Sequence, residues 1–317
     1  MKKIAIITSI ITLCLAGFTH AQSVSITQII GHPALDSVYK GVVTSLNEAG
    51  FTVAKGLKIN YQNAQGNPAI ATQIAEKFVM DKPDLIIAIS TPSAQAVALK
   101  TKDIPIIFSA ISNPIEAKLM TNLENPTGNI TGIMDSPPMD AQINLILEII
   151  PTAKTIGIIY NPTEANSVSM VADFKNLATL KNIKIIEAHA TKTDEVATAT
   201  KTLVGRVDAI YVPLDNTIIS EFESVAKVAT QEKIPLFAAD TDTILRGAAA
   251  SIGFDYYELG KQTGRMAVKV LQGTPIANIP ATRADIIDLV INLKVSQEQG
   301  LVIPDAVIKR AKEVLFY

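Results

Sequence analysis

The sequence predicts an α/β protein made of two Rossmann-like lobes, each built on a parallel sheet. Three observations support this fold class. Short apolar runs alternate with segments of helical length, which is typical of right-handed β-α-β units. The alternation is interrupted once, near residues 129–139, where Gly132 and Pro137-Pro138 break the periodicity, and it then resumes. The chain of 317 residues is also long enough for about two average domains.

The first series of units precedes the interruption. Its helices are marked by a proline at or near the first residue, and the first helix also by Gly50 at its end. Asn67 is a suitable N-cap for the second. The third apolar run has no polar alternation, as expected for a strand that is covered on both faces. The expected helices are 33–50, 67–80 and one that opens at Thr91-Pro92, and the expected strands are 24–30, 57–61, 84–90 and 104–110.

The second series repeats this pattern, and the rhythm changes after Arg246. The last elements are too few for a third domain, so we expect the two lobes to share them, with several chain crossings and a cleft. In the second series, strands are expected at 154–160, 183–188, 208–212 and 234–239, and helices at 166–181, 193–204 and 216–232. The last elements are expected to be a strand at 248–254, a helix at 256–271, a strand at 288–292 and a terminal helix at 304–314.

The first residues have the pattern of a secretory signal peptide. Two lysines precede an apolar run from 4 to 18, which is too short for a comfortable membrane span, and Ala21 is a small residue suited to cleavage. We expect cleavage after Ala21; an uncleaved anchor helix is the alternative. Leu13 before Cys14 argues against a lipoprotein. The only cysteine then leaves with the leader, so the exported chain has none.

Composition excludes several function classes. A net charge of −2 offers no basic face for nucleic acid. One cysteine and three histidines leave little for a metal site, and no Gly-Lys-Ser/Thr or Gly-x-Gly-x-x-Gly motif for a nucleotide cofactor is found. The sequence also shows no Cys-His or Ser-His-Asp arrangement that would supply a catalytic nucleophile and its general base. We therefore expect no cofactor, no metal and no catalytic residue.

Parallel α/β sheets bind ligands at the carboxyl ends of their strands, beside helix N-termini. Polar residues gather at these positions, and a hinge aromatic accompanies them, although each polar residue could equally serve only to cap a helix. The predicted ligand-binding residues are Thr27, Gln28, His32, Thr91, Ser93, Ser109, Asn113, Tyr160, Asn161, Glu164, Asp215, Asn216, Asp240 and Phe254.

Two of these positions suggest the charges of the ligand. Ser93 lies in the first turn of a helix, whose free N–H groups attract a carboxylate. Asp240 and Asp242 lie on the other lobe and could face a cation such as an α-ammonium group. A free amino acid carries both charges.

Several motifs resemble one family along the whole chain. They are Thr91-Pro92-Ser93-Ala94-Gln95, Tyr160-Asn161-Pro162, Asp215-Asn216-Thr217 and Gly253-Phe254-Asp255-Tyr256-Tyr257. They resemble the ABC-transporter substrate-binding proteins of the tryptophan/tyrosine-binding type. The resemblance implies the type I periplasmic-binding-protein fold, with three crossings between lobes of residues 22–133 with 253–283, and 134–252 with 284–317.

The resemblance also implies a function. It implies a monomeric periplasmic receptor that captures a small ligand, such as an aromatic amino acid, by hinge closure and delivers it to a membrane permease and ATPase. Ser109 or Asn113 would assist Asp240 in holding the ammonium group. Asn161, Glu164 and Asp215 would contribute from the second lobe, and Tyr160 and Phe254 would form a pocket wall.

Three other function classes are alternatives to a transport receptor. A transcription regulator of this fold would need a helix-turn-helix before the first strand, where the leader pattern stands instead. An exported hydrolase would need the missing nucleophile and base. A ligand-sensing module for a membrane receptor or kinase stays open as the alternative.

Overall fold

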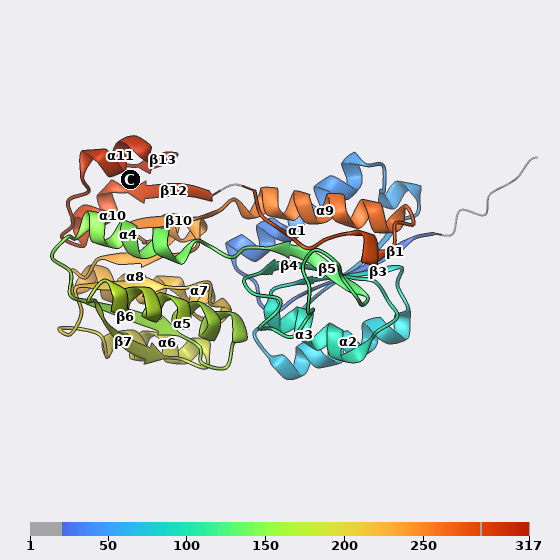
Figure 1. Cartoon of the computed structure of the whole chain (residues 1–317), viewed down its shortest axis with the longest axis horizontal. Coiled ribbons are helices and arrows are strands. Elements are labelled where there is room, and N and C mark those ends of the chain that lie inside the picture. Colours follow the sequence, from blue (N-terminus) through green and yellow to red (C-terminus); the bar gives the residue numbers. More distant parts are fainter. Residues whose placement is uncertain (1–20, 286, 317) are drawn as a thin grey trace, which may run out of the picture.

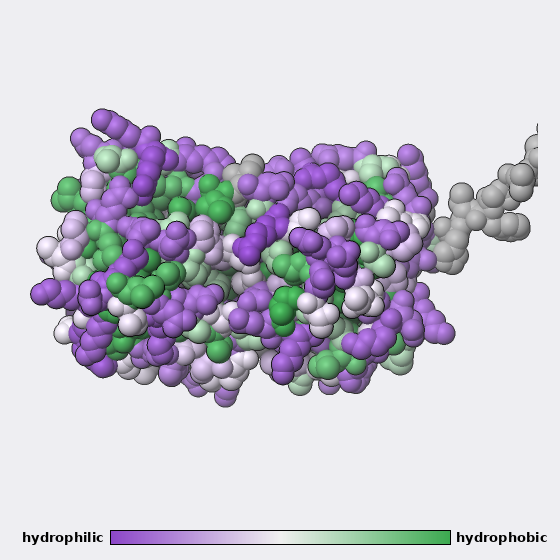
Figure 2. All heavy atoms as spheres, viewed as in Figure 1, coloured by the Kyte–Doolittle hydropathy of each residue, from purple (hydrophilic) through white to green (hydrophobic). Residues whose placement is uncertain are grey.

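The computed structural model describes residues 21–285 and 287–316. The expected leader, apart from Ala21, lies outside these residues, so it stays a prediction. Two α/β lobes lie end to end along the long axis of the molecule (Figure 1), and the surface narrows between them (Figure 2). Among the described residues, no helix is long and apolar enough to cross a membrane.

The first lobe is built on a six-stranded sheet in which every neighbouring pair is parallel. Helices cover both faces, α1 and α9 on one side and α2 and α3 on the other (Figure 1). This double cover explains why every residue of β3 is buried, as its apolar run predicts. In sheet order the strands are β11 (Thr282–Arg283), β5 (Ile130–Met134), β4 (Ile106–Ile111), β3 (Leu85–Ile89), β1 (Ser23–Gln28) and β2 (Lys58–Asn63).

The helices of this lobe begin where the sequence predicts. Pro33 is the first residue of the first helix, and the Asn67 side chain caps the second by accepting from two backbone N–H groups. The helices are α1 (Pro33–Glu48), α2 (Pro68–Asp81), α3 (Thr91–Lys100) and α9 (Tyr256–Leu271), with short 3₁₀ turns η1 (Val53–Lys55) and η4 (Ile276–Asn278).

Helix α9 is joined to the first lobe by an unusually close contact with α1. A Cβ atom at Gly260 would lie 2.2 Å from the carbonyl oxygen of Val38, and one at Gly41 would lie 2.2 Å from that of Tyr257. Only glycine permits this approach of the two backbones. The contact fixes a late helix of the chain against its first helix.

The second lobe is built on a seven-stranded sheet that is parallel except for one strand pair. Strand β12 runs antiparallel to β10, because β10 leaves this lobe toward the first one and β12 returns from it. In sheet order the strands are β13 (Glu313–Leu315), β12 (Ile287–Asn292), β10 (Ala250–Phe254), β9 (Leu236–Ala238), β8 (Ala209–Val212), β6 (Thr155–Tyr160) and β7 (Lys184–His189).

The helices of the second lobe include one predicted helix that is divided in two. The expected helix at 216–232 breaks at Glu221, because the Arg246 guanidinium donates to the carbonyl oxygens of Ile219 and Ser220 and so ends the first part. The helices are α4 (Met139–Ile149), α5 (Ala165–Leu180), α6 (Val196–Lys201), α7 (Asn216–Ser220), α8 (Phe222–Gln231), α10 (Leu293–Glu298) and α11 (Asp305–Arg310), with 3₁₀ turns η2 (Thr193–Glu195) and η3 (Thr241–Arg246).

The chain passes between the lobes three times. It crosses between β5 and α4, between β10 and α9, and between β11 and β12. This confirms the predicted fold of two sheets joined by three crossings. The exact lobe boundaries stay a prediction.

Two further element predictions were wrong. The interruption near 129–139 contains the buried strand β5, because Gly132 is a point of close backbone approach to Phe108 and does not break the strand. The terminal helix stops at Arg310, since Ala311 is extended and the last residues pair with β12 as strand β13.

Candidate ligand-binding site

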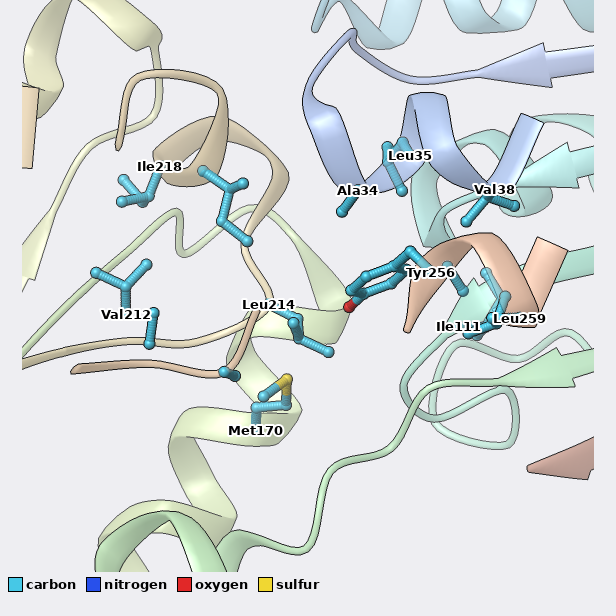
Figure 3. Close-up of a cluster of buried hydrophobic side chains, with 14 of the residues drawn as sticks. Ala34, Leu35, Val38, Ile111, Met170, Val212, Leu214, Ile218, Tyr256 and Leu259 are labelled. Atoms are coloured by element: carbon cyan, nitrogen blue, oxygen red, sulfur yellow. The ribbon is translucent and has the colours of Figure 1, made fainter. Parts of the chain in front are cut away.

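A narrow buried cavity lies between the lobes at the carboxyl ends of the strands. Its volume is about 20 Å³, which is room for about one water molecule. Figure 3 shows Leu35 and Tyr256 of the first lobe facing Leu214 of the second across this region. The lining residues are His32, Leu35, Thr91, Ala110, Ser112, Asp135, Asn166, Leu214, Asn216, Ile219, Asp240 and Tyr256.

The N-terminus of α3 reaches the cavity through Thr91. No side chain caps this helix, and the hydroxyl groups of Ser90 and Ser93 are buried without a hydrogen-bond partner among the described residues. Free N–H groups and the positive end of the helix dipole favour an anion at such a place.

The backbone beside this helix end is strained. Ser90 has φ 79° and Ala110, which lines the cavity, has φ 56°. Both angles lie in the left-handed region that side chains rarely adopt. Such strain is held in place only by a rigid surrounding structure, and it clusters at ligand sites.

Two buried carboxyl groups, which we call the acidic pair, face the cavity. They are Asp135, in the first crossing, and Asp240, at the end of β9. Among the described residues that line the cavity, none is Lys or Arg. Asp135 accepts from the Ser112 hydroxyl at 3.1 Å and from the Tyr256 hydroxyl at 3.3 Å.

The environment of the acidic pair opposes its ionisation. Burial raises the pKa of Asp135 to about 6. Burial and the neighbouring charge of Asp242 raise the pKa of Asp240 as well. The nearby Arg246 lowers the pKa of Asp240 only slightly, because its guanidinium group forms a two-pronged ion pair with Glu223 at 2.6–2.7 Å. A cationic group in the cavity would stabilise the ionised carboxylates and lower the pKa values of both.

His32 lies just before α1, and its side chain is buried at the cavity wall. Neither ring nitrogen has a hydrogen-bond partner among the described residues. Burial, and then the positive charge of Arg246, lower the pKa of His32 to about 3. The Asn216 amide lies near enough to oppose this shift, but it does not reach hydrogen-bond geometry. The imidazole is therefore neutral.

Asn166 faces the cavity from the start of α5. Its amide nitrogen donates to the carbonyl oxygen of Leu214 at 2.7 Å, while its side-chain oxygen is buried without a partner among the described residues. The nitrogen is thus held by the protein, and the oxygen is left as an acceptor at the wall.

Glu164 and Asp215 are already surrounded by donors from the protein. Glu164 accepts from the backbone and side chains of Asn216 and Thr217 at 2.5–3.1 Å. Asp215 accepts from the backbone of Asn161 and the Ser167 hydroxyl, both at 2.6 Å, and it caps α7. Burial and the charge of Glu164 raise the pKa of Asp215. These carboxylates hold the loops that carry Asn166 and Asn216.

Of the predicted site residues, the structure brings four to the cavity wall: His32, Thr91, Asn216 and Asp240. The others lie nearby or in the lobes, where most have partners within the protein; for example, Gln28 donates to Asp36 and Ser109 pairs with Thr263. Ligand contact by these others stays a prediction. They are Thr27, Gln28, Ser93, Ser109, Asn113, Tyr160, Asn161, Glu164, Asp215 and Phe254.

Asn113, Tyr160 and Phe254 lie outside the cavity lining. Asn113 lines a separate open groove of about 530 Å³ between the lobes and donates to Ser169 of α5 at 3.5 Å. The Tyr160 hydroxyl donates to Glu187 of β7, the edge strand next to β6. Phe254 is buried within β10 and lies outside the cavity lining, as does Tyr160.

The sequence reasoning missed most of the apolar wall and one half of the acidic pair. Asp135 directly follows β5. Because ligands bind at the carboxyl ends of parallel strands, which we call the strand-end rule, recognising β5 would have identified Asp135 as a candidate. Tyr256 belongs to the noted Gly253–Tyr257 motif. Leu35, Leu214 and Ile219 carry no local signal, because an apolar cavity residue resembles any core residue.

Comparison with known proteins supports this arrangement. The sequence model of the ABC transporter substrate binding protein family matches residues 23–315. The chain belongs to this family. As predicted, it is a substrate-binding protein and not an enzyme.

The substrate-binding protein has close relatives with named ligands. It is 41% identical over 271 residues to the tyrosine-binding protein of Clostridioides difficile strain R20291, covering 86% of this chain and 79% of the relative. It is 36% identical to a Streptococcus pneumoniae protein solved in complex with L-Trp, with a TM-score of 0.90, covering 93% of this chain and all of that one. These findings confirm the predicted family.

A third comparison concerns the arrangement of the lobes. A Clostridium difficile substrate binding protein with adhesive properties, in a ligand-free open structure, is 39% identical over 93% of this chain and all of that one. Its TM-score is only 0.70, although its identity slightly exceeds that of the L-Trp complex. The two lobes of the substrate-binding protein are therefore arranged more like those of the L-Trp complex than like those of the ligand-free open structure.

Proposed function

We propose that this protein captures an aromatic amino acid, tyrosine or tryptophan, in the cavity between its lobes and delivers it to the permease and ATPase of an ABC importer. The observation that carries the proposal is the charge pattern of the cavity. An acidic pair without a committed cation and an uncapped helix N-terminus meet in one buried space. A zwitterion supplies the two missing charges.

The amino acid's ammonium group binds the acidic pair. A cation there allows both carboxylates to ionise, and the Tyr256 hydroxyl already orients Asp135. The carboxylate of the ligand binds the N-terminus of α3, where Ser90 and Ser93 offer hydroxyl groups beside the free backbone N–H groups.

The aromatic side chain is accommodated by the apolar part of the wall. Leu35 and Tyr256 contribute from the first lobe, and Leu214 and Ile219 from the second. An aromatic ring gains from contact with such side chains, and stacking on Tyr256 adds to this. The relatives that are named for tyrosine or solved with L-Trp support the same class of ligand.

Capture requires movement of the lobes. The present cavity is too small for an amino acid, so the ligand enters an open form, and the lobes then close on it less tightly than in the present structure. Asp135 and Tyr256 lie at two of the crossings, so a ligand bound there contacts the hinge itself. This links ligand binding to closure.

The proposal includes export and assembly. The leader is cleaved after Ala21, and the mature monomer works in the periplasm, outside the cytoplasmic membrane. The two lobes comprise residues 22–133 with 253–283, and 134–252 with 284–317.

The test is calorimetric titration of the purified protein with each of the twenty amino acids. Tyrosine or tryptophan is expected to bind with the highest affinity. If no amino acid binds, the ligand class is wrong. Uptake of the labelled ligand by cells with and without the protein then separates import from sensing, because only an importer component makes uptake dependent on the protein.

A further inference from the structure

We propose that His32 and Asn166, which we call the polar pair, determine specificity by hydrogen-bonding a donor on the ligand's aromatic ring. The phenol O–H of tyrosine and the indole N–H of tryptophan both provide such a donor, and phenylalanine does not. This inference rests on the proposed function, since it concerns the ligand of the same cavity.

The placement of His32 is fixed by its backbone. The residue is extended, with φ −158° and ψ 161°, and its carbonyl oxygen accepts from the backbone N–H of Asp36 at 3.0 Å. The Gln28 side chain donates to Asp36 and to the carbonyl oxygen of Ile30, both at 2.8 Å, which holds the loop. The ring is thus presented to the cavity by a rigid turn, with neither nitrogen engaged by a described residue.

The placement of Asn166 is fixed by its amide nitrogen. That nitrogen donates to the carbonyl oxygen of Leu214 and, more weakly at 3.3 Å, to Glu164. A flip of the Asn166 amide, which would exchange its oxygen and nitrogen, would lose both of these hydrogen bonds. What faces the cavity from the second lobe is an acceptor.

The polar pair is neutral, which separates its role from that of the other polar groups. The acidic pair matches an ammonium group, and the N-terminus of α3 matches a carboxylate. His32 stays uncharged across the physiological pH range because burial and Arg246 keep its pKa near 3. One of its nitrogens is then an acceptor, as is the oxygen of Asn166. The remaining partner on an amino acid is a neutral donor.

Unpaired buried polar groups make the site selective. A ligand without a ring donor leaves one more acceptor of the polar pair buried and unpaired, and sites built this way reject such analogues strongly. By contrast, a purely apolar pocket separates ligands of similar shape by only about 10–200-fold.

The experiment is calorimetric measurement of Kd for L-tyrosine, L-tryptophan and L-phenylalanine. Wild type is expected to bind the better of the first two more than about 200-fold more tightly than phenylalanine, which exceeds the preference of a purely apolar pocket. His32→Leu is expected to lose about tenfold or more for that ligand and less than threefold for phenylalanine. His32→Gln, which keeps an acceptor, should retain part of the preference.

His189→Leu is the matched control, because His189 is half exposed at the end of β7 and is not among the residues that line the cavity. It is expected to leave all three affinities unchanged. A ligand-side comparison needs no variant. 4-Fluorophenylalanine is close to tyrosine in size but lacks the donor, so wild type should bind it more than about 200-fold more weakly than tyrosine if tyrosine is the preferred ligand.

Two results would overturn the inference while leaving the proposed function intact. One is a wild type that binds phenylalanine as tightly as tyrosine and tryptophan. The other is a His32→Leu variant that weakens all three ligands equally, which would place His32 at the main chain of the ligand. If wild type binds none of the three, the proposed function itself has failed, and the inference fails with it.

Discussion

Asp135 is expected to make the ligand-free protein less stable at neutral pH, so Asp135→Asn should stabilise the fold. Burial raises the pKa of this carboxyl group from 3.8 to about 6, even though Ser112 and Tyr256 donate to it. One pKa unit corresponds to about 1.4 kcal/mol, so the ionised group costs the fold about 3 kcal/mol at pH 7. Asparagine keeps the shape and one acceptor oxygen without the charge.

The contribution of Asp135 to the free energy of unfolding depends on pH. Between about pH 4 and pH 6 the folded protein binds the proton more tightly than the unfolded chain, so stability from this group falls as the pH rises. At pH 7 the full cost is present, and below pH 4 both states are protonated and the cost disappears. The stabilisation by Asp135→Asn should therefore be largest at pH 7 and shrink toward pH 4.

The assay is thermal unfolding, followed by circular dichroism, of wild type and variant without ligand. A gain of up to about 3 kcal/mol corresponds to a rise in Tm on the order of 5 °C at pH 7. Asp103→Asn, at an exposed position, is the control and should change little. The reasoning would be refuted if Asp135→Asn were no more stable than wild type at pH 7, or if any gain were the same at pH 4. The same variant should bind the amino acid at least tenfold more weakly.

Three further predictions concern binding and packing. In titration calorimetry, Ser93→Ala should weaken amino-acid binding by about threefold, and Asp240→Ala should weaken it by at least about tenfold. Unchanged affinity in both variants would refute the assigned charges. Affinity should fall at least about tenfold from pH 7 to pH 5, because protons compete with the ligand's ammonium group for Asp135, whose pKa is about 6, and for Asp240, whose pKa is also raised; a flat profile would exclude these contacts. Gly260→Ala should lower stability by about 2–4 kcal/mol in denaturant unfolding, since its Cβ would meet a backbone carbonyl of α1, whereas Gly128→Ala, with no atom near, should not.

The elements that the sequence predicts well are those with local signals. Pro33 and Asn67 mark helix starts because their chemistry acts within one turn. Gly132 misled the prediction, since the same residue that ends a strand elsewhere here permits β5 to approach Phe108. Whether glycine breaks a strand or allows close packing depends on a neighbour that is distant in the sequence.

The candidate site also contains residues that local sequence signals identify and residues whose role depends on distant neighbours. The strand-end rule placed Thr91, Asn216 and Asp240 at the cavity because sheet topology alone brings these positions together. It could not separate wall residues from Glu164 and Asp215, whose polar side chains are taken up by neighbouring loops. That distinction depends on which donors the fold brings within about 3 Å, and no local pattern records it.

The most direct test of the account is a crystal structure of the protein grown with L-tyrosine or L-tryptophan. We predict one ligand molecule between the lobes, with its ammonium group within hydrogen-bond distance of Asp135 and Asp240 and its carboxylate at the N-terminus of α3. A ligand bound outside this cavity, or one whose carboxylate faces the acidic pair, would contradict the account.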